Sequence, residues 1–135
     1  MILYKAGYKY QLAADYTIQT DIKPDEFART PRLRLDTDGE LYILEGYAWD
    51  GPSGPTIDTK NFMRGSLVHD ALYQLMRQGH ISPENWRKPA DDLLIKICRE
   101  DGMSALRAWW VYQGVRFGGG PAASKEGLKE VFRAG

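Results

Sequence analysis

Three side chains that could transfer a proton or bind a cation lie within five residues of one another, between positions 69 and 73. His69 carries an imidazole, the group most often used to move protons in catalysis, Asp70 carries a carboxylate and Tyr73 a hydroxyl. If this segment is helical, side chains three and four residues apart share one flank. The spacing therefore predicts a proton acceptor, an oxygen ligand for a cation and a hydroxyl around one point.

A second carboxylate, Asp91, falls on the apolar side of a second predicted helix. It shares that side with Leu94 and Cys98, whereas its neighbour Asp92 lies among lysines on the solvent face. A buried charge without a partner is strongly destabilising, so we expect Asp91 to pair with His69. Such a pair would fix the tautomer of the imidazole and leave its other nitrogen to accept a proton.

The segment from Trp49 to Asp58 precedes the first predicted helix and is rich in oxygen ligands. It contains two carboxylates, Asp50 and Asp58, and several carbonyls in a run of glycine and proline. Calcium and magnesium both prefer such hard oxygen ligands, and Asp70 would contribute to a cation site beside His69. A cation there would polarise a carbonyl or phosphoryl oxygen while His69 activates water.

The same residues also fit a purely structural interpretation. Asp91, His69 and Tyr73 would then form a buried hydrogen-bond cluster that locks two helices together, and the preceding loop would be a turn-rich crossover. The small residues Gly65 and Ser66, one turn before His69, favour the functional interpretation. Helical side chains lean toward the N-terminus, so we expect this turn to leave room for a loop, a metal or a substrate.

The elements that position these groups follow from the spacing of apolar residues. In the first third, apolar residues alternate as in half-buried strands, and Asp38-Gly39 favours a tight hairpin turn. From about residue 59 they recur at helical spacing, with Gly79 as a helix end and Ser82-Pro83 as the next start. The sequence therefore predicts an α+β fold, in which a small N-terminal antiparallel sheet precedes three or four helices. An antiparallel helix pair carries the His-Asp-x-x-Tyr and Ala-Asp motifs.

A third predicted helix, from Ser104 to Phe117, is apolar on nearly every side. Such a helix lies in the core or beneath a partner, and we expect the core. Oligomerisation through Trp109, Trp110 and a C-terminal helix is the partner-bound alternative. We assign residues 1–118 to a single α+β domain, and residues 119–135 to a glycine-rich linker and a short C-terminal helix.

Composition narrows the classes of function. The 135 residues include 18 basic and 18 acidic side chains, so no strong field attracts nucleic acid, and we expect no nucleic-acid partner. Cys98 is the single cysteine, which excludes an intramolecular disulfide and a multi-cysteine zinc site. No apolar run suits a signal peptide or a membrane-spanning helix, so we expect a soluble protein.

Several motifs follow one another in the second half of the chain: Tyr47 to Pro55, Val68 to Tyr73, Ala90-Asp91, Tyr112 and Val115-Arg116. Their order resembles a phage and prophage domain family of unknown function. The resemblance covers roughly residues 41–118, and Gly54 departs from the family's loop pattern by intruding between serine and proline. It implies a bacteriophage or prophage origin and a location in the host bacterial cytoplasm or in the virion.

A histidine, aspartate and tyrosine on one helix with an aspartate on the next are also similar to secreted and parvoviral phospholipases that cleave the sn-2 ester. This resemblance implies His69 as the base and Asp91 with Tyr73 as the groups that orient it. It implies calcium as the cofactor. The implied calcium ligands are Asp70 and Asp50, and the implied oxyanion donors are the N–H groups of Gly51, Ser53 and Gly54.

Three hypotheses of function follow. The first is a phage-encoded, cation-assisted ester hydrolase that acts on phospholipid membranes during infection or lysis. The second is a non-catalytic virion or assembly component that binds other phage proteins. The third is a small host-modulating interaction protein.

Overall fold

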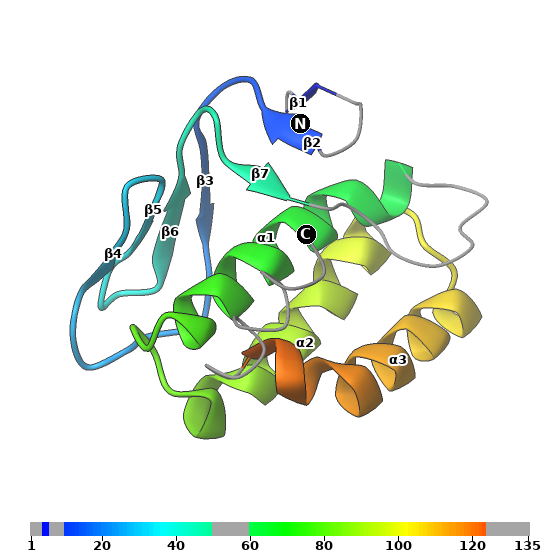
Figure 1. Cartoon of the computed structure of the whole chain (residues 1–135). Helices are drawn as coiled ribbons and strands as arrows, with labels where there is room; N and C mark the ends of the chain where they lie inside the picture. The colour runs from blue at the N-terminus through cyan, green and yellow to red at the C-terminus, as the bar shows by residue number, and fades with distance from the viewer. Residues whose placement is uncertain (1–3, 6–9, 50–59, 124–135) are drawn as a thin grey trace.

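The structure is a computed structural model and describes residues 4–5, 10–49 and 60–123 (Figure 1). Short antiparallel strands form two small sheets, and three helices follow them in the chain. This is the predicted α+β arrangement. The sequence predicted one sheet, and the second sheet arises because a late strand returns to the start of the chain.

The four-stranded sheet contains the predicted hairpin. Its strand order is β3-β6-β5-β4, all antiparallel, and Leu33 pairs with Ile43 across the hairpin. Gly39 closes the turn with φ of 93°, a conformation that suits glycine, and its N–H donates to the carbonyl of Asp36 at 3.0 Å. The strands are β3 (Tyr16–Gln19), β4 (Ala28–Arg29), β5 (Leu33–Leu35) and β6 (Glu40–Ile43).

The second sheet joins the start of the chain to the segment that enters the helices. Its order is β1-β2-β7, and Tyr10 of β2 pairs with Trp49 of β7. β7 has only two residues, so its sequence shows no alternation by which it could be predicted. The strands are β1 (Tyr4–Lys5), β2 (Tyr10–Leu12) and β7 (Ala48–Trp49).

The three helices begin close to the predicted signals, and the first two also end close to them. Gly79 follows the first helix with φ of 79°, and Ser82 is the N-cap residue of the second. The hydroxyl of Ser104 accepts the N–H of Arg107 at 3.2 Å and so caps the third. The helices are α1 (Lys60–Arg77), α2 (Pro83–Glu100) and α3 (Ala105–Ala123).

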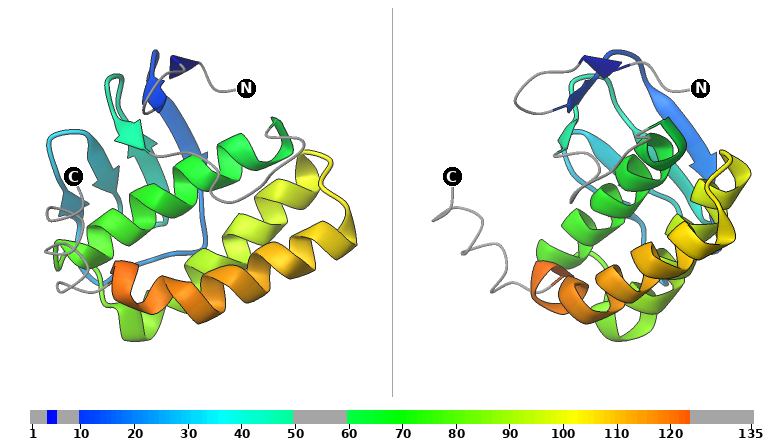
Figure 2. Two further views of the ribbon diagram at one scale, coloured as in Figure 1. Left: turned by 45° about the vertical axis from the view of Figure 1, so that its right-hand side comes forward. Right: turned by 90° about the vertical axis from the view of Figure 1, so that its right-hand side faces the viewer.

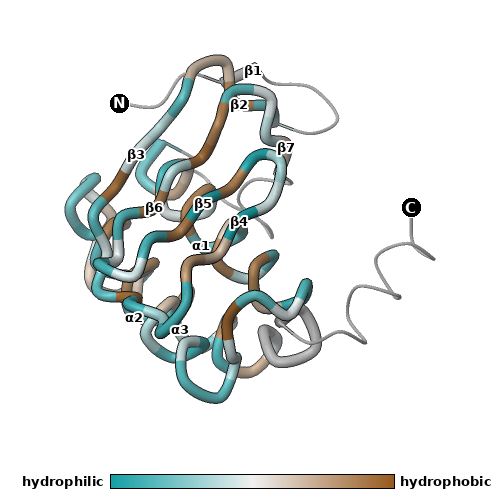
Figure 3. Tube along the Cα trace, turned by 90° about the vertical axis from the view of Figure 1, so that its left-hand side faces the viewer, coloured by the Kyte–Doolittle hydropathy of each residue, from teal (hydrophilic) through white to brown (hydrophobic). Residues whose placement is uncertain are grey.

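α1 lies between the four-stranded sheet and the pair formed by α2 and α3 (Figure 2). Viewed from the sheet side, hydrophobic segments recur along the strands that cover α1 (Figure 3). A first buried cluster joins this sheet to α1, and a second joins the three helices. The first includes Leu33, Leu35, Leu41, Ile43, Leu67, Leu72 and Leu75, and the second is formed by Phe62, Leu94, Cys98, Met103 and Ala108.

α3 departs from the prediction in two ways. It continues to Ala123, so residues 119–123, predicted as linker, are helical. Glycine costs about 1 kcal/mol per residue in a helix, but extending an existing helix requires no new nucleus. The domain boundary at residue 118 stays a prediction, and the predicted C-terminal helix lies outside the described residues.

The second departure concerns the apolar side chains of α3, which we expected in the core. Leu106, Trp109, Trp110 and Phe117 are 52–87% exposed, and only the opposite side of the helix, with Ala108, packs inward. The expectation of a core position is therefore wrong for these four residues.

Among the described residues, no helix combines the length and apolar character needed to cross a membrane.

Candidate functional site

The contacts between α1 and α2 show that the two helices run antiparallel. Tyr73, in the last third of α1, binds Asp91 in the middle of α2. Arg64, near the start of α1, binds Asp101 just after α2, with N–O distances of 3.0 Å. The short connection between the helices therefore brings the His-Asp-x-x-Tyr motif against the Ala-Asp motif.

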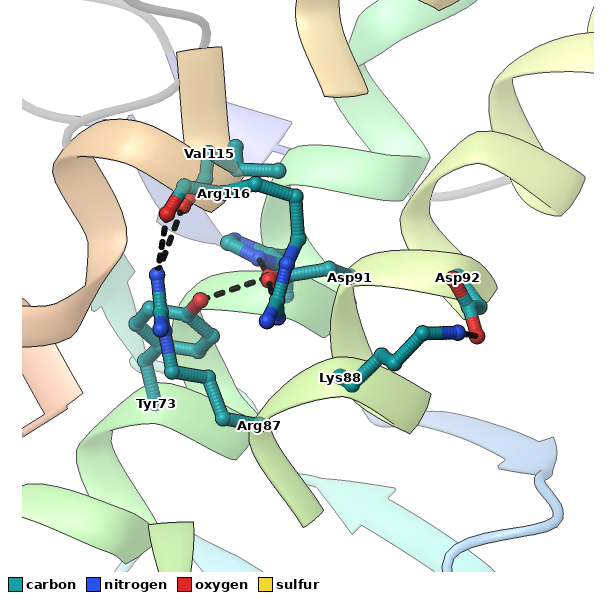
Figure 4. A network of polar contacts seen from close by, with 8 residues as sticks. Tyr73, Arg87, Lys88, Asp91, Asp92, Val115 and Arg116 are labelled. Carbon is teal, nitrogen blue, oxygen red and sulfur yellow. Dashed lines mark hydrogen bonds and ion pairs between the residues drawn. The ribbon is translucent and has the colours of Figure 1, made fainter. Parts of the chain in front are cut away.

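Asp91 is the centre of a buried polar cluster that joins all three helices (Figure 4). It is fully buried, and its Oδ1 accepts from His69 Nε2 at 2.6 Å and from the Tyr73 hydroxyl at 2.5 Å. Its Oδ2 accepts from Nη1 of Arg116, on α3, at 2.8 Å. Three donors thus satisfy the buried carboxylate, as burial of a charge requires.

These donors keep Asp91 ionised. Burial raises the pKa of its carboxyl, but the hydrogen bonds from His69, Tyr73 and Arg116 together lower it by more. The pKa of Asp91 therefore lies below its ordinary value of 3.8. Because an ionised carboxylate only accepts hydrogen bonds, the Nε2 of His69 must carry the proton.

His69 is consequently held in one tautomer. In a neutral imidazole with its proton on Nε2, the Nδ1 atom carries a lone pair, and within the described ranges Nδ1 makes no hydrogen bond. The ring stacks at a tilt on Tyr73, with ring centroids 4.2 Å apart, and 9% of the side chain stays exposed. This geometry suits a proton acceptor at Nδ1.

Tyr73 acts in the cluster as a neutral donor. Burial and its hydrogen bond to Asp91 raise the pKa of the phenol well above its ordinary value of 10.0. The hydroxyl therefore keeps its proton and donates it to Oδ1. The structure thus brings Tyr73, Asp91 and His69 together, and their catalytic roles stay a prediction.

The small residues before His69 do not leave the open room that we expected. A Cβ on Gly65 would lie 2.9 Å from Cys98 Sγ and 3.0 Å from Leu94 Cδ1, so α2 fills this space. Ser66 accepts from Nε1 of Trp49 at 3.1 Å. The expectation is wrong here because small residues in a helix allow close packing of a neighbour as readily as they leave a void.

The predicted metal ligands are only partly covered by the structure. Asp70 is half-buried on α1 and has an interaction partner. Calcium takes six to eight oxygen ligands, and the described ranges contain no group of three or more acidic, histidine or cysteine side chains that could hold a metal. The other candidates, Asp50, Gly51, Ser53 and Gly54, lie outside the described residues.

Sequence reasoning missed the roles of two arginines, Arg116 and Arg87. Arg116 forms the ion pair with Asp91, and Arg87 donates from Nη2 to the carbonyls of Val115 and Arg116 at 3.2 and 2.7 Å. The sequence feature that could have predicted Arg116 is the charge of Asp91, because a buried carboxylate needs a cation as its partner. α3 offers only two arginines, at 107 and 116, to supply it.

The solvated role predicted for Asp92 is confirmed. Its carboxylate is exposed and pairs with Lys88 one turn earlier, at 3.0 Å. Adjacent aspartates on α2 therefore face opposite environments. Asp92 provides a matched control for every experiment on Asp91.

The chain has no significant match among protein-family models, curated proteins or solved structures. The resemblances to a phage domain family and to sn-2 phospholipases therefore stay expectations based on the motifs. What the protein does has to be argued from the cluster itself.

Proposed function

We propose that the protein is an ester hydrolase that uses His69 as a general base and Asp91 as the group that orients it. The observation that carries this proposal is the 2.6 Å contact between His69 Nε2 and Asp91 Oδ1, with Nδ1 left without a hydrogen bond in the described structure. A buried carboxylate that fixes the tautomer of a histidine is an arrangement suited to water activation, and 9% of the His69 side chain is exposed.

The reaction follows from these atoms. Nδ1 of His69 removes a proton from water as the water oxygen attacks the ester carbonyl carbon. Asp91 stabilises the imidazolium that forms, because the two charges are opposite and adjacent. The imidazolium then returns the proton to the departing alkoxide, so that one ester and one water give an acid and an alcohol.

We propose a phospholipid as the substrate and a membrane surface as the place of action. Leu106, Trp109, Trp110 and Phe117 support this choice because they expose an apolar side of α3, and tryptophan favours the boundary between lipid and water. The motif resemblances support a phage or prophage origin and a role in infection or lysis.

Calcium is the cofactor that we propose for this activity. Asp70 would be one ligand, and the ion would polarise the ester carbonyl. The described residues do not assemble a calcium site, so further ligands would have to come from the segment that contains Asp50. The proton transfers are assigned to His69 and Asp91, and calcium would supply the polarisation of the ester carbonyl that makes hydrolysis depend on it.

The test is release of fatty acid from phosphatidylcholine vesicles, measured with added calcium and with a chelator. We expect hydrolysis that requires calcium and falls at least about tenfold in Asp91→Asn. Asp92→Asn removes the same charge from the neighbouring position and should hydrolyse at the wild-type rate. Equal rates for the two variants would contradict a catalytic role for the cluster.

A non-catalytic role as a virion or assembly component is the second candidate function. The exposed side chains on α3 favour it, since large apolar patches on soluble proteins often mark protein-binding sites. Host-modulating binding would use the same surface. Sedimentation with candidate phage or host proteins, with Trp110→Ser as the control, separates this candidate from the hydrolase: binding without hydrolysis supports it.

A further inference from the structure

The two oxygens of Asp91 have different partners, and this division has a mechanical consequence. Oδ1 accepts from His69 and Tyr73 on α1, whereas the donor to Oδ2 among the described residues is Arg116 on α3. The terminal torsion of aspartate is soft, so a carboxylate held through one oxygen can rotate. Donors on both oxygens prevent that rotation.

The structure fixes Arg116 from two sides. Arg87 and Asp91 lie one turn apart on α2 and both reach α3. Arg87 donates to the backbone carbonyl of Arg116 at 2.7 Å. The guanidinium of Arg116 in turn donates to Oδ2 of Asp91 at 2.8 Å. Figure 4 shows these contacts together. α3 is therefore locked to α2 at the residue that binds the carboxylate.

We propose that Arg116 is a positioning residue for His69: it fixes the rotation and the charge of the Asp91 carboxylate, which in turn holds the imidazole in its Nε2–H tautomer. The inference rests on the proposed function. The proposal makes α3 part of the site, although His69 and Tyr73 lie on α1 and Asp91 lies on α2. Arg116 would act through Asp91, without touching the substrate.

The charge balance of the cluster supports this role. The cation of Arg116 pairs with the anion of Asp91, whereas the other nearby cation, Arg87, acts on Tyr73. Without Arg116, the buried carboxylate would lose this ion pair, which favours protonation of the carboxylate or of the imidazole. Either change reduces the population of the neutral Nε2–H tautomer that a general base needs.

The test is the NMR spectrum of the His69 imidazole in the whole protein without substrate. In the wild type we expect a proton signal from Nε2–H that exchanges slowly, with nitrogen shifts of a single neutral tautomer. Arg116→Gln should lose this signal or give mixed tautomers, and Arg116→Lys should recover it in part because a cation returns. Arg107→Gln is the control on the same helix.

An unchanged signal in Arg116→Gln would overturn the assignment. Arg116→Met keeps the aliphatic stem and removes only the charged fork, so the question stays answerable if the glutamine variant does not fold. In a protein that hydrolyses lipid, kcat should fall about tenfold or more in these variants with little change in KM.

This readout is independent of turnover. If the wild type hydrolyses no ester but the signal still depends on Arg116, the proposed function fails while control of the imidazole by Arg116 stands. If the wild type hydrolyses lipid and the Nε2–H signal is the same with and without the Arg116 guanidinium, only the positioning role of Arg116 fails.

Discussion

The Nε2 atom of His69 on α1 lies 2.6 Å from Oδ1 of Asp91 on α2. This contact links the chemistry of the protein to its folding, because it stands in the interface of the two most closely associated helices. The carboxylate is ionised and fully buried, so each donor to it contributes to stability as well as to the orientation of the imidazole.

Tyr73→Phe removes one donor to this buried carboxylate and leaves the aromatic packing in place. Hydrogen bonds to charged groups contribute about 1.5–3 kcal/mol, so we expect the free energy of unfolding to fall by about that amount. Urea denaturation measures it. Tyr112→Phe is the control, since the Tyr112 hydroxyl makes no hydrogen bond with any described residue, and it should change stability little. Equal losses in both variants would show that the bond to Asp91 contributes nothing.

Asp91 also makes stability depend on pH. Burial raises its pKa, the three hydrogen bonds lower it by more, and the folded value lies below the ordinary 3.8. The unfolded chain therefore binds the proton more readily, and the contribution of the carboxylate is present above about pH 4 and is lost as the pH falls further. Wild-type stability should drop more steeply than that of Asp91→Asn as the pH falls below about 4.

Denaturant titrations at several pH values check this sign. Asp92→Asn, which removes an exposed aspartate, should follow the wild-type slope. A wild type whose stability below pH 4 parallels that of Asp91→Asn would mean that the carboxylate is not ionised in the folded protein.

Gly65→Ala tests whether α1 and α2 touch at this turn. The new Cβ would lie 2.9 Å from Cys98 Sγ, and such overpacking costs about 1–3 kcal/mol, against a gain of about 1 kcal/mol in helix propensity. We expect a net loss of up to about 2 kcal/mol. Gly114→Ala, where no atom lies within 4 Å of the new Cβ, should instead stabilise by about 1 kcal/mol. Thermal melting compares the two, and a stabilised Gly65→Ala would argue against close helix contact there.

Trp110→Ser addresses the membrane part of the proposal. Trp110 is 63% exposed, so its loss should change stability by less than about 0.5 kcal/mol. Hydrolysis of vesicles should fall, because the apolar side of α3 loses its anchor, while hydrolysis of a soluble short-chain ester should not change. A parallel loss on both substrates would indicate damage to the site and not to lipid contact.

The sequence was informative where local pattern and short connections decide the structure. The apolar stripe beside Asp91 and the short link between the helices sufficed to pair it with His69 and Tyr73. The turn at Asp38-Gly39 and the helix end at Gly79 followed from backbone preferences. These features depend on residues that are close in the sequence or joined by a tight turn.

The features that the sequence did not predict depend on how distant elements pack against one another. No local sequence pattern carries that information. Arg116 reaches Asp91 only because α3 folds back along α2. The exposure of Trp109 and Trp110 depends on which side of an almost wholly apolar helix packs inward. Gly65 permitted two interpretations, an open space or a close contact, and the positions of Cys98 and Leu94 on α2 decide between them.

The most direct test of the account compares phospholipid hydrolysis by the wild type, His69→Ala and His80→Ala. His80 is exposed after α1 and serves as the matched control. We predict equal hydrolysis by the wild type and His80→Ala and a loss of about a hundredfold or more in His69→Ala. A wild type that releases no fatty acid, or a His69→Ala variant as active as His80→Ala, would contradict a general base at this position.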